Sequence, residues 1–477
     1  RVSNINNMFV FTLKIYVLMK KQLSKPLFCA FSVMFSLAAV NAQSKQEKEP
    51  GINVSYMNTK ISPTEDFFKY VNGTWLDQTE IPSDRTSWGS FNELRQKTDD
   101  NALAILKEAS KNPKYKSNTD QGKAIALFNT ILDTVGRNKQ GVKPLQPTLK
   151  KIDAIKNVTD LQNFLTETQS QGSSLGFFGV YVGADAKNSN KNSVTLNVGG
   201  LGLSDKDYYN SDDKDSKEKR EKYEVHVARM LQFISESPAK AKESAKQILA
   251  LEIEMSAPRL DRVERRDRRK QYNPTAIADL KKNTPSIQWE KYFTGIGMTK
   301  LDTVNVAQPR YMTALEKIFT EKKVEAWKEY LKWSLLNRTA STLSTEIENA
   351  NFDFYGKTLT GALKQRPRQE VALQVINGAT GEALGKLYVE KLFPAEAKEK
   401  AKKMISNVML AYENRINALP WMSAETKTKA IEKLKKLTVK IGYPDKWKDY
   451  SALVLKNVNE GGTYFDNMKN ISKWSYA

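Results

Sequence analysis

Apolar residues recur at spacings of three and four along three segments of this chain. Such spacing places them on one face of a helix, and that face is usually buried. The three stripes are Tyr223, Val227, Met230, Leu231 and Ile234; then Trp327, Tyr330, Leu331 and Leu335; and finally Ala397, Ala401, Met404, Ile405, Val408 and Tyr412. We therefore expect three helices that pack these stripes into a core.

One region has a different period. Residues 176–185 (GFFGVYVGAD) and 193–200 (SVTLNVGG) are rich in aromatic and β-branched residues, and a polar run separates them. This pattern predicts a β-hairpin with a long turn. The GGLGLS segment that follows lacks the glycine spacing of a phosphate-binding loop. The predicted fold class is mainly α, a multi-helical lobe with a small β-hairpin at about residues 176–200.

A further helix is predicted in LPWMSAETKTKAIEKLKKLTVKIGYPDKWKDY, residues 419–450. Ser423 is the expected N-cap, because its hydroxyl can accept a hydrogen bond from a free backbone N–H of the first turn. Ala430, Leu434 and Leu437 form an apolar stripe. Gly442 and Pro444 are expected to end the helical segment and redirect the chain.

The chain has 477 residues and a formal net charge of +21, and the basic excess persists without the first 42 residues. Most lysines alternate with glutamates at helical spacing, and the densest basic run, RVERRDRRK at 262–270, has acids within it. We therefore expect a solvated charged surface and no nucleic-acid partner. A basic protein that binds nucleic acid or an anionic surface is the weakest alternative, and salt-dependent DNA binding would test it.

The N-terminus is typical of export. Residues 1–18 are interpreted as upstream sequence, 19–42 as a signal peptide with a cleavage site after Ala42, and 43–60 as a linker. The apolar run at 27–40 is shorter than the about 20 residues of a membrane span, so we expect no stable span after cleavage. Cys29, the only cysteine, lies in the signal. A cysteine-free exported protein favours the bacterial periplasm or secretion.

No catalytic or metal-binding residue can be assigned from the residues alone. The chain has one histidine, His226, whereas a zinc-peptidase HExxH site needs two on one helix face. His226 borders an apolar stripe, so we expect a structural, partly buried side chain. Residues 172–176 (GSSLG) match G-x-S-x-G, but the expected order of helix then strand is the reverse of a nucleophile elbow.

Five segments in order, however, carry a family resemblance. They are 63–95 (PTEDFFKYVNGTWLDQTEIPSDRTSWGSFNELR), 199–209 (GGLGLSDKDYY), 265–273 (RRDRRKQYN), 381–393 (GEALGKLYVEKLF) and 419–450. Together they resemble the neprilysin and endothelin-converting-enzyme family of zinc metallopeptidases. The resemblance implies that residues 61–440 form the helical lobe that caps the active site. Residues 441–477 would begin the connection to a catalytic domain that is missing here.

The resemblance also implies three substrate-binding positions. Phe91 matches a phenylalanine that lines the pocket for the residue just after the scissile bond, and Arg95 matches an arginine of the next pocket. Asn92 stands where neprilysin has an aspartate. Ser87 stands where it has an arginine that binds a substrate's free carboxylate, which favours an endopeptidase. From the residues alone we would place Phe91 in the core and Arg95 on the surface.

The resulting hypothesis is the substrate-chamber lobe of an exported zinc metalloendopeptidase that acts on oligopeptides. In the family, the zinc ligands and the general base follow the aligned segment. Zinc is thus the implied cofactor of the intact enzyme, and we expect this chain alone to bind no catalytic zinc and to be inactive. We also expect exposed apolar surface where the missing lobe would dock. The alternative is a naturally truncated, non-catalytic helical protein that binds peptides or a partner.

Overall fold

A computed structural model describes residues 51–477 and divides the chain into two compact units, the first ending at Glu80 and the second beginning at Ile81. The predicted upstream segment and signal peptide lie outside the described residues. The described part of the first unit contains η1 (Val54–Tyr56) and α3 (Phe67–Gln78). The Asp66 carboxylate caps α3 by accepting a hydrogen bond from the Lys69 N–H at 2.9 Å.

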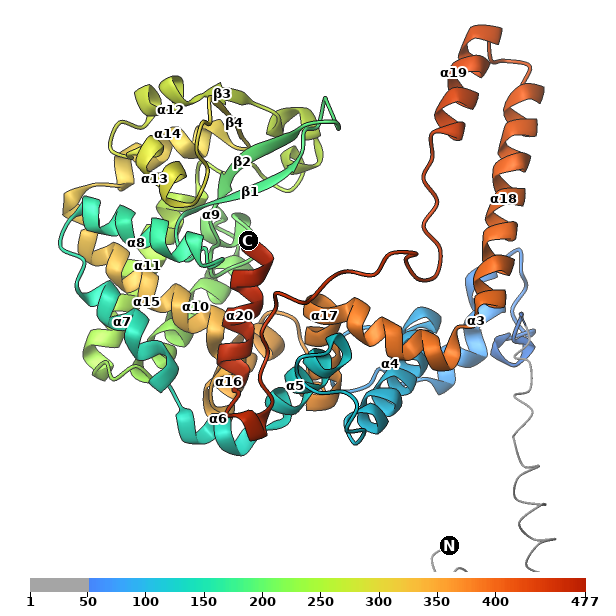
Figure 1. Cartoon of the computed structure of the whole chain (residues 1–477), viewed down its shortest axis with the longest axis horizontal. Helices are drawn as coiled ribbons and strands as arrows, with labels where there is room; N and C mark the ends of the chain where they lie inside the picture. The colour runs from blue at the N-terminus through green and yellow to red at the C-terminus, as the bar shows by residue number, and fades with distance from the viewer. Residues whose placement is uncertain (1–50) are drawn as a thin grey trace, which may run out of the picture. The chain divides into compact units, whose positions relative to one another are not determined.

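The second unit is built mainly from helices (Figure 1). They are α4 (Ser90–Ala109), α5 (Asp120–Leu132), α6 (Thr134–Gln140), α7 (Gln146–Asp153), α8 (Val158–Ser170), α9 (Asp207–Asn210), α10 (Lys214–Gln232), α11 (Pro238–Ser256), α12 (Ile277–Asn283), α13 (Trp289–Gly295), α14 (Pro309–Ile318), α15 (Val324–Thr339), α16 (Thr345–Phe352), α17 (Arg368–Leu392), α18 (Ala395–Ala418), α19 (Ala424–Lys435) and α20 (Tyr464–Tyr476). A π-helical turn, η7 (Asp353–Thr358), follows α16 directly. The mainly α prediction is confirmed.

A four-stranded sheet interrupts the helices. Its strands are β1 (Phe178–Ala184), β2 (Asn192–Val198), β3 (Pro274–Ala276) and β4 (Thr303–Val306), in the order β1-β2-β4-β3. β1 and β2 pair antiparallel, with Phe178 opposite Val198, so the predicted hairpin is confirmed. β4 runs parallel to β2, and β3 pairs antiparallel to β4. The two short strands carry too few residues to show a period of two in the sequence.

The larger core lies where β1 meets the surrounding helices. Phe177 packs against Trp327 with ring centroids 4.3 Å apart, and Phe178 packs against Trp289 at 5.2 Å. The indole N–H of Trp327 donates to the Ile318 carbonyl at 3.0 Å, so this buried donor is satisfied. The predicted stripes on α10 and α15 lie in this core or against it, as expected.

A second core joins segments that are distant in sequence. It consists of residues of α4, α5 and α17 together with a C-terminal stretch that includes Tyr450, Leu453, Leu455 and Ile471 of α20. The buried ammonium of Lys123 on α5 donates to the Tyr450 carbonyl, and the Asn467 amide donates to the Thr130 hydroxyl of α5 at 3.2 Å. The C-terminal stretch therefore holds α5 through both apolar packing and hydrogen bonds to side chains of α5.

The glycine-rich segment after β2 is fixed by side chains from α15, from η7 and from the turn that follows α11. The Gly199 carbonyl accepts from Arg259 at 2.9 Å, and the Gly200 carbonyl accepts from the Tyr330 hydroxyl at 2.8 Å. The Gly202 carbonyl accepts from the Tyr355 hydroxyl at 3.0 Å. Because carbonyls of three of its residues have partners, this turn is a structural joint with little backbone left free for a ligand.

A fully buried carboxylate completes this joint. Glu252 accepts hydrogen bonds from the Gly202 N–H at 3.0 Å and from the Tyr209 hydroxyl at 2.9 Å. Burial raises the pKa of Glu252 to about 7, and the hydrogen bonds oppose that rise. A Cβ at Gly202 would lie 1.7 Å from the Tyr223 hydroxyl, so only glycine fits this close approach.

The third predicted stripe behaves differently. α18 and α19 form a helical hairpin (Figure 1), and Ser423 caps α19 as predicted, accepting from the Thr426 N–H at 3.2 Å. The expectation that the α18 stripe is buried is wrong, because Met404, Val408 and Tyr412 are all about half exposed or more. Lys398 is the buried residue of α18, and α19 buries none of its residues. Ala397, Ala401 and Ile405 of the same stripe are half-buried, so the described residues cover the stripe only in part.

The two tryptophans Trp327 and Trp421 offer a matched test of this packing. Trp327 is fully buried, whereas Trp421, at the tip of the α18–α19 hairpin, is 74% exposed. Trp327→Ala should lower the free energy of unfolding by about 3–5 kcal/mol, because it leaves a large cavity. Trp421→Ala should change it by less than about 0.5 kcal/mol. Urea unfolding followed by circular dichroism measures both, and equal losses would contradict this assignment of the core.

Candidate functional site

The three predicted substrate-binding residues lie on the first two turns of α4. Phe91 is 87% exposed, Asn92 is half-buried, and Arg95 is exposed one turn further along the helix. Leu94 is also exposed, at 61%. The expectation from the residues alone that Phe91 is a core residue is therefore wrong. The arrangement presents an aromatic ring and a guanidinium on one exposed stretch of helix, since residues four apart share a face.

The Arg95 side chain keeps part of its hydrogen-bonding capacity. Its Nε donates to both carboxylate oxygens of Asp99, at 3.0 and 3.1 Å, while its two Nη atoms have no hydrogen bond within residues 51–477. These Nη donors could bind a carbonyl or carboxylate of a peptide. The contact with Asp99 also sets the direction of the guanidinium along the helix.

A buried ion pair fixes the start of α4. Arg85 contacts Asp84 at 2.6 Å and Glu370 of α17 at 2.5 Å, with the arginine side chain only 10% exposed. Gln96 of α4 donates to the same Glu370 at 3.3 Å. Because few waters reach this pair, it holds α4 against the start of α17 more firmly than an exposed pair would. The exposed side chains of α4 therefore project from an anchored helix.

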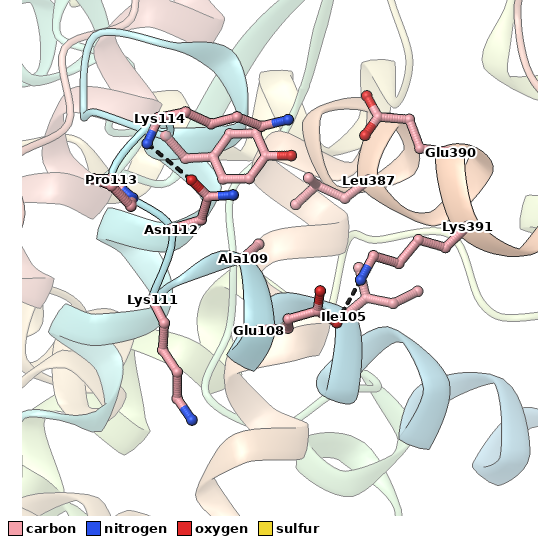
Figure 2. A pocket seen from close by; sticks show the side chains of 11 residues that line it. Ile105, Glu108, Ala109, Lys111, Asn112, Pro113, Lys114, Leu387, Glu390 and Lys391 are labelled. Atoms are coloured by element: carbon pink, nitrogen blue, oxygen red, sulfur yellow. Dashed lines mark hydrogen bonds and ion pairs between the residues drawn. The ribbon is translucent and has the colours of Figure 1, made fainter. Parts of the chain in front are cut away.

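A hollow of about 540 Å³ lies near the other end of α4, beside α17 (Figure 2). Ile105, Ala109 and Leu387 supply apolar lining, and charged side chains form its edges. Lys391 and Glu108 form an ion pair across it, and the Lys114 ammonium lies 4.7 Å from the centre of the Tyr115 ring. No nucleophile with an adjacent base is present in this hollow, so its residues indicate no reaction.

His226 is surrounded by aromatic rings. It is 5% exposed and stacks on Phe354 at 4.8 Å, with Trp333 and Tyr355 edge-on at 5.5 and 5.4 Å. Burial, reinforced by the nearby Arg229 charge, lowers the pKa of His226 to about 3, whereas Asp353 opposes this shift. The Nε2 atom has no hydrogen-bond partner. The predicted structural role is confirmed, with deeper burial than the expected partial burial.

Two carboxylates meet near the turn between α10 and α11. Glu236 Oε1 and Glu329 Oε1 lie 3.9 and 3.3 Å from the Lys332 ammonium, and Lys240 lies 3.6 Å from Glu329. Burial and the Glu329 charge raise the pKa of Glu236 to about 7. The pKa of Glu329 is lowered: burial alone would raise it, but Lys332 and hydrogen bonding outweigh burial. No local sequence pattern reveals this pair, because its members are 93 positions apart.

The remaining candidate chemistry gives no site. Within residues 51–477, no group of three or more His, Cys, Asp or Glu side chains is arranged to hold a metal ion. Ser174, from the GSSLG segment, donates to the Phe178 carbonyl at 3.2 Å, and α8 precedes it while β1 follows. It is part of the loop structure and lacks the strand–turn–helix context of a nucleophile.

Within residues 51–477, no helix is both long enough and apolar enough to span a membrane.

Comparisons with known proteins agree with this architecture. The profile of the N-terminal region of peptidase family M13 matches residues 63–444. The chain is 26% identical over 405 residues to endothelin-converting enzyme 1 of Bos taurus, covering 82% of this chain and 53% of that protein. It is 28% identical to the neutral endopeptidase of Lactobacillus helveticus, covering 86% of this chain and 62% of that protein.

Solved structures give the same result. The zinc metalloprotease ZMP1 of Mycobacterium tuberculosis, solved with an inhibitor, matches with a TM-score of 0.78 and 31% identity, over 89% of this chain and 64% of that one. PEPO of Lactobacillus rhamnosis matches with a TM-score of 0.76 at 19% identity, which supports the fold alone. The fold is thus that of neprilysin-like zinc metallopeptidases. This chain belongs to peptidase family M13. It spans about half to two thirds of the length of these relatives.

His226 allows a direct test of the aromatic enclosure, because it is the only histidine in the chain. Its pKa is about 3 in the folded state and close to 6.5 when unfolded, so its neutral form stabilises the fold. That stabilisation is complete above pH 6.5 and is lost as the pH falls from 6.5 toward 3. In the folded protein, the imidazole NMR signals should not titrate between pH 5 and 8. A midpoint near 6.5 in folded protein would contradict the enclosure, and His226→Gln should remove this part of the pH dependence.

Proposed function

We propose that this chain is the N-terminal substrate-chamber lobe of an exported zinc metalloendopeptidase that acts on oligopeptides. The observation that carries the proposal is the family match over residues 63–444, together with a structural match at 31% identity to a zinc metalloprotease. Residues 61–440 form the lobe in this proposal, and residues 441–477 begin the connection to the catalytic domain. Export to the bacterial periplasm or beyond follows from the predicted signal peptide.

The exposed surface of α4 supports a role in peptide binding. Phe91 is far more exposed than an aromatic residue that serves only the core, and Arg95 keeps Nη donors available. In the proposed function, Phe91 contacts the substrate residue just after the scissile bond, Arg95 contacts the next one, and Asn92 lies between them. Ser87 cannot bind a free carboxylate bidentately as arginine does, which favours cleavage within a peptide chain.

The exposed apolar residues of the α18–α19 hairpin support a second lobe. Met404, Val408, Leu410 and Tyr412 of α18 are 46–60% exposed, and Trp421 at the hairpin tip is 74% exposed. Large exposed apolar groups that cluster on one element usually mark an interface. We assign this surface to the catalytic lobe of the intact protein, which would carry the zinc ligands and the general base. Zinc would there polarise the scissile carbonyl and activate water.

The chain of 477 residues by itself should contain far less than one zinc per molecule after purification with zinc. It should also not hydrolyse internally quenched peptides. The reason is that one histidine cannot form the paired-histidine site of this class. Elemental analysis and fluorescence measure the two quantities. Near-stoichiometric zinc with peptide turnover would contradict the proposal that the zinc site belongs to a second lobe.

The nucleotide sequence downstream of Ala477 distinguishes the proposal from the alternative of a naturally truncated binding protein. An open frame that encodes Asn-Ala-Tyr-Tyr, then HExxH and a later ExxxD, supports the peptidase. An immediate in-frame stop supports the non-catalytic protein. In the former case, the longer chain should hydrolyse the quenched peptides and lose that activity with a chelator.

Phe91→Ala tests the α4 surface in the chain as it stands. The substitution removes an exposed ring, so the free energy of unfolding should change by less than about 0.5 kcal/mol. Affinity for an oligopeptide should fall about tenfold, since burial of a phenylalanine ring in a complex contributes on the order of 1.5 kcal/mol or more. Val135→Ala is the matched control, because Val135 is 79% exposed on α6, away from α4. Equal affinities for all three proteins would remove Phe91 from the proposed site.

A further inference from the structure

β1 is an edge strand, and its hydrogen-bonding pattern identifies which backbone groups face outward. The Gly199 N–H donates to the Phe177 carbonyl, and the Asp185 N–H donates to the Lys191 carbonyl. Backbone groups of an antiparallel strand alternate in direction from one residue to the next. The odd-numbered residues from 177 to 185 therefore pair with β2, and the even-numbered residues direct their N–H and C=O groups to the open edge.

The first half of that edge is already capped, and the second half is open. The Phe178 carbonyl accepts from Ser174 at 3.2 Å, and the Val180 carbonyl accepts from the Gln169 amide at 3.4 Å. Val182 and Ala184 lie opposite Val194 and Asn192, and their outward N–H and C=O groups have no partner within the described residues. Both residues are exposed, Val182 to 54%. Two donors and two acceptors thus line a short exposed edge.

This edge lacks the features that normally keep a strand from pairing further. Natural edge strands carry charged residues or proline, or are covered by other elements. β1 reads FGVYVGA, with no charge and no proline, and its open half also exposes the Tyr181 ring to 55%. The N–H and C=O groups of an extended peptide alternate with the same period as the outward N–H and C=O groups of β1. An extended peptide can therefore pair with this edge.

The turn beyond the open edge adds a charge preference. Lys187 and Lys191 lie in the β1–β2 turn, and neither forms an ion pair within residues 51–477. The Lys187 ammonium lies 5.1 Å from the centre of the Tyr272 ring, and the adjacent Asp185 carboxylate accepts from the Tyr272 hydroxyl at 3.2 Å. The Asp185 carboxylate near the turn thus already accepts a hydrogen bond. The ammonium groups of Lys187 and Lys191 remain available to carboxylates of a ligand.

We propose that the edge from Val182 to Ala184 binds an extended oligopeptide by strand addition, with acidic residues of the peptide next to the Lys187–Lys191 turn. The choice of an oligopeptide as the ligand rests on the proposed function. The position of the binding edge does not. It adds a peptide-binding position separate from the α4 surface. Such a position would hold part of a long substrate while another part reaches the chamber.

Val182→Pro is the decisive variant. Proline removes the outward N–H and sterically blocks an incoming strand, yet it is tolerated on an edge strand where the N–H faces solvent. Val182→Ala is the matched control, because it shortens the side chain and keeps the N–H. The probe is a fluorescein-labelled peptide of about eight alternating valines and threonines with two glutamates at one end, and anisotropy with the full chain measures binding. Val182→Pro should weaken binding about tenfold, and Val182→Ala less than about threefold.

Two modified probes test the mode of binding. N-methylation of alternate peptide nitrogens keeps every side chain but removes strand pairing, and it should reduce binding as much as Val182→Pro. Replacing the glutamates with lysines should weaken binding, and Lys187→Glu with Lys191→Glu should restore it. Circular dichroism checks folding, and Ala184→Pro is the second variant if Val182→Pro unfolds. Its expected effect is the same.

Three outcomes would overturn the inference. The first is binding that neither proline variant changes. The second is absence of binding by any of these probes, and peptide hydrolysis by a longer chain would then leave the proposed function intact. The third is a dimer, seen by sedimentation, that Val182→Pro dissociates, which would assign the edge to a second copy of this chain.

Discussion

The buried carboxylate of Glu252 is the constraint on which the larger core depends. It binds the glycine-rich turn after β2 and the Tyr209 hydroxyl at once, so it ties the sheet to α9 and α11. Around it, Tyr330 and Tyr355 bind carbonyls of the same turn, and the Trp333 indole N–H donates to the Tyr223 hydroxyl at 2.9 Å. A carboxylate without these donors would be costly at such depth, so the turn and the acid each require the other. The exposed edge of β1 belongs to the sheet that this joint ties to the helices.

The two proposed binding surfaces are exposed, whereas the residues that hold them in place are buried. Phe91 and Arg95 are exposed, but the Arg85–Glu370 pair that anchors their helix is largely buried. Val182 is exposed, but Phe178 and Val180 of the same strand are in the core. Side chains that would contact a ligand can in this way be exposed to solvent while buried residues of the same region hold their backbone in place. The α18–α19 hairpin has little of this internal support, since Lys398 is the only residue that it buries within the described part of the chain.

The sequence predicted the helices and the hairpin where local pattern and packing agree. The stripes on α10 and α15 are buried because other helices and β1 cover them. The equally regular stripe on α18 is largely exposed because the described elements cover it only in part. The spacing of apolar residues identifies the apolar face of a helix. Whether that face is buried depends on which other elements pack against it. The exposure of Phe91 was opposite to the expectation from its residue type, and the family resemblance alone pointed to that position. Pairs such as Glu236 with Glu329 join distant residues, so no local signal reveals them.

The two perturbed groups near α10 have opposite effects on the protons exchanged during unfolding. At a pH between about 4.5 and 6.5, unfolding releases a proton from Glu236, whose pKa falls from about 7 to its ordinary 4.5. Over the same interval unfolding takes up a proton at His226, whose pKa rises from about 3 to 6.5. The two exchanges largely cancel. Glu252, whose pKa burial also raises to about 7, releases a further proton on unfolding in this interval. The three groups together therefore make the folded state less stable as the pH rises from about 4.5 toward 6.5.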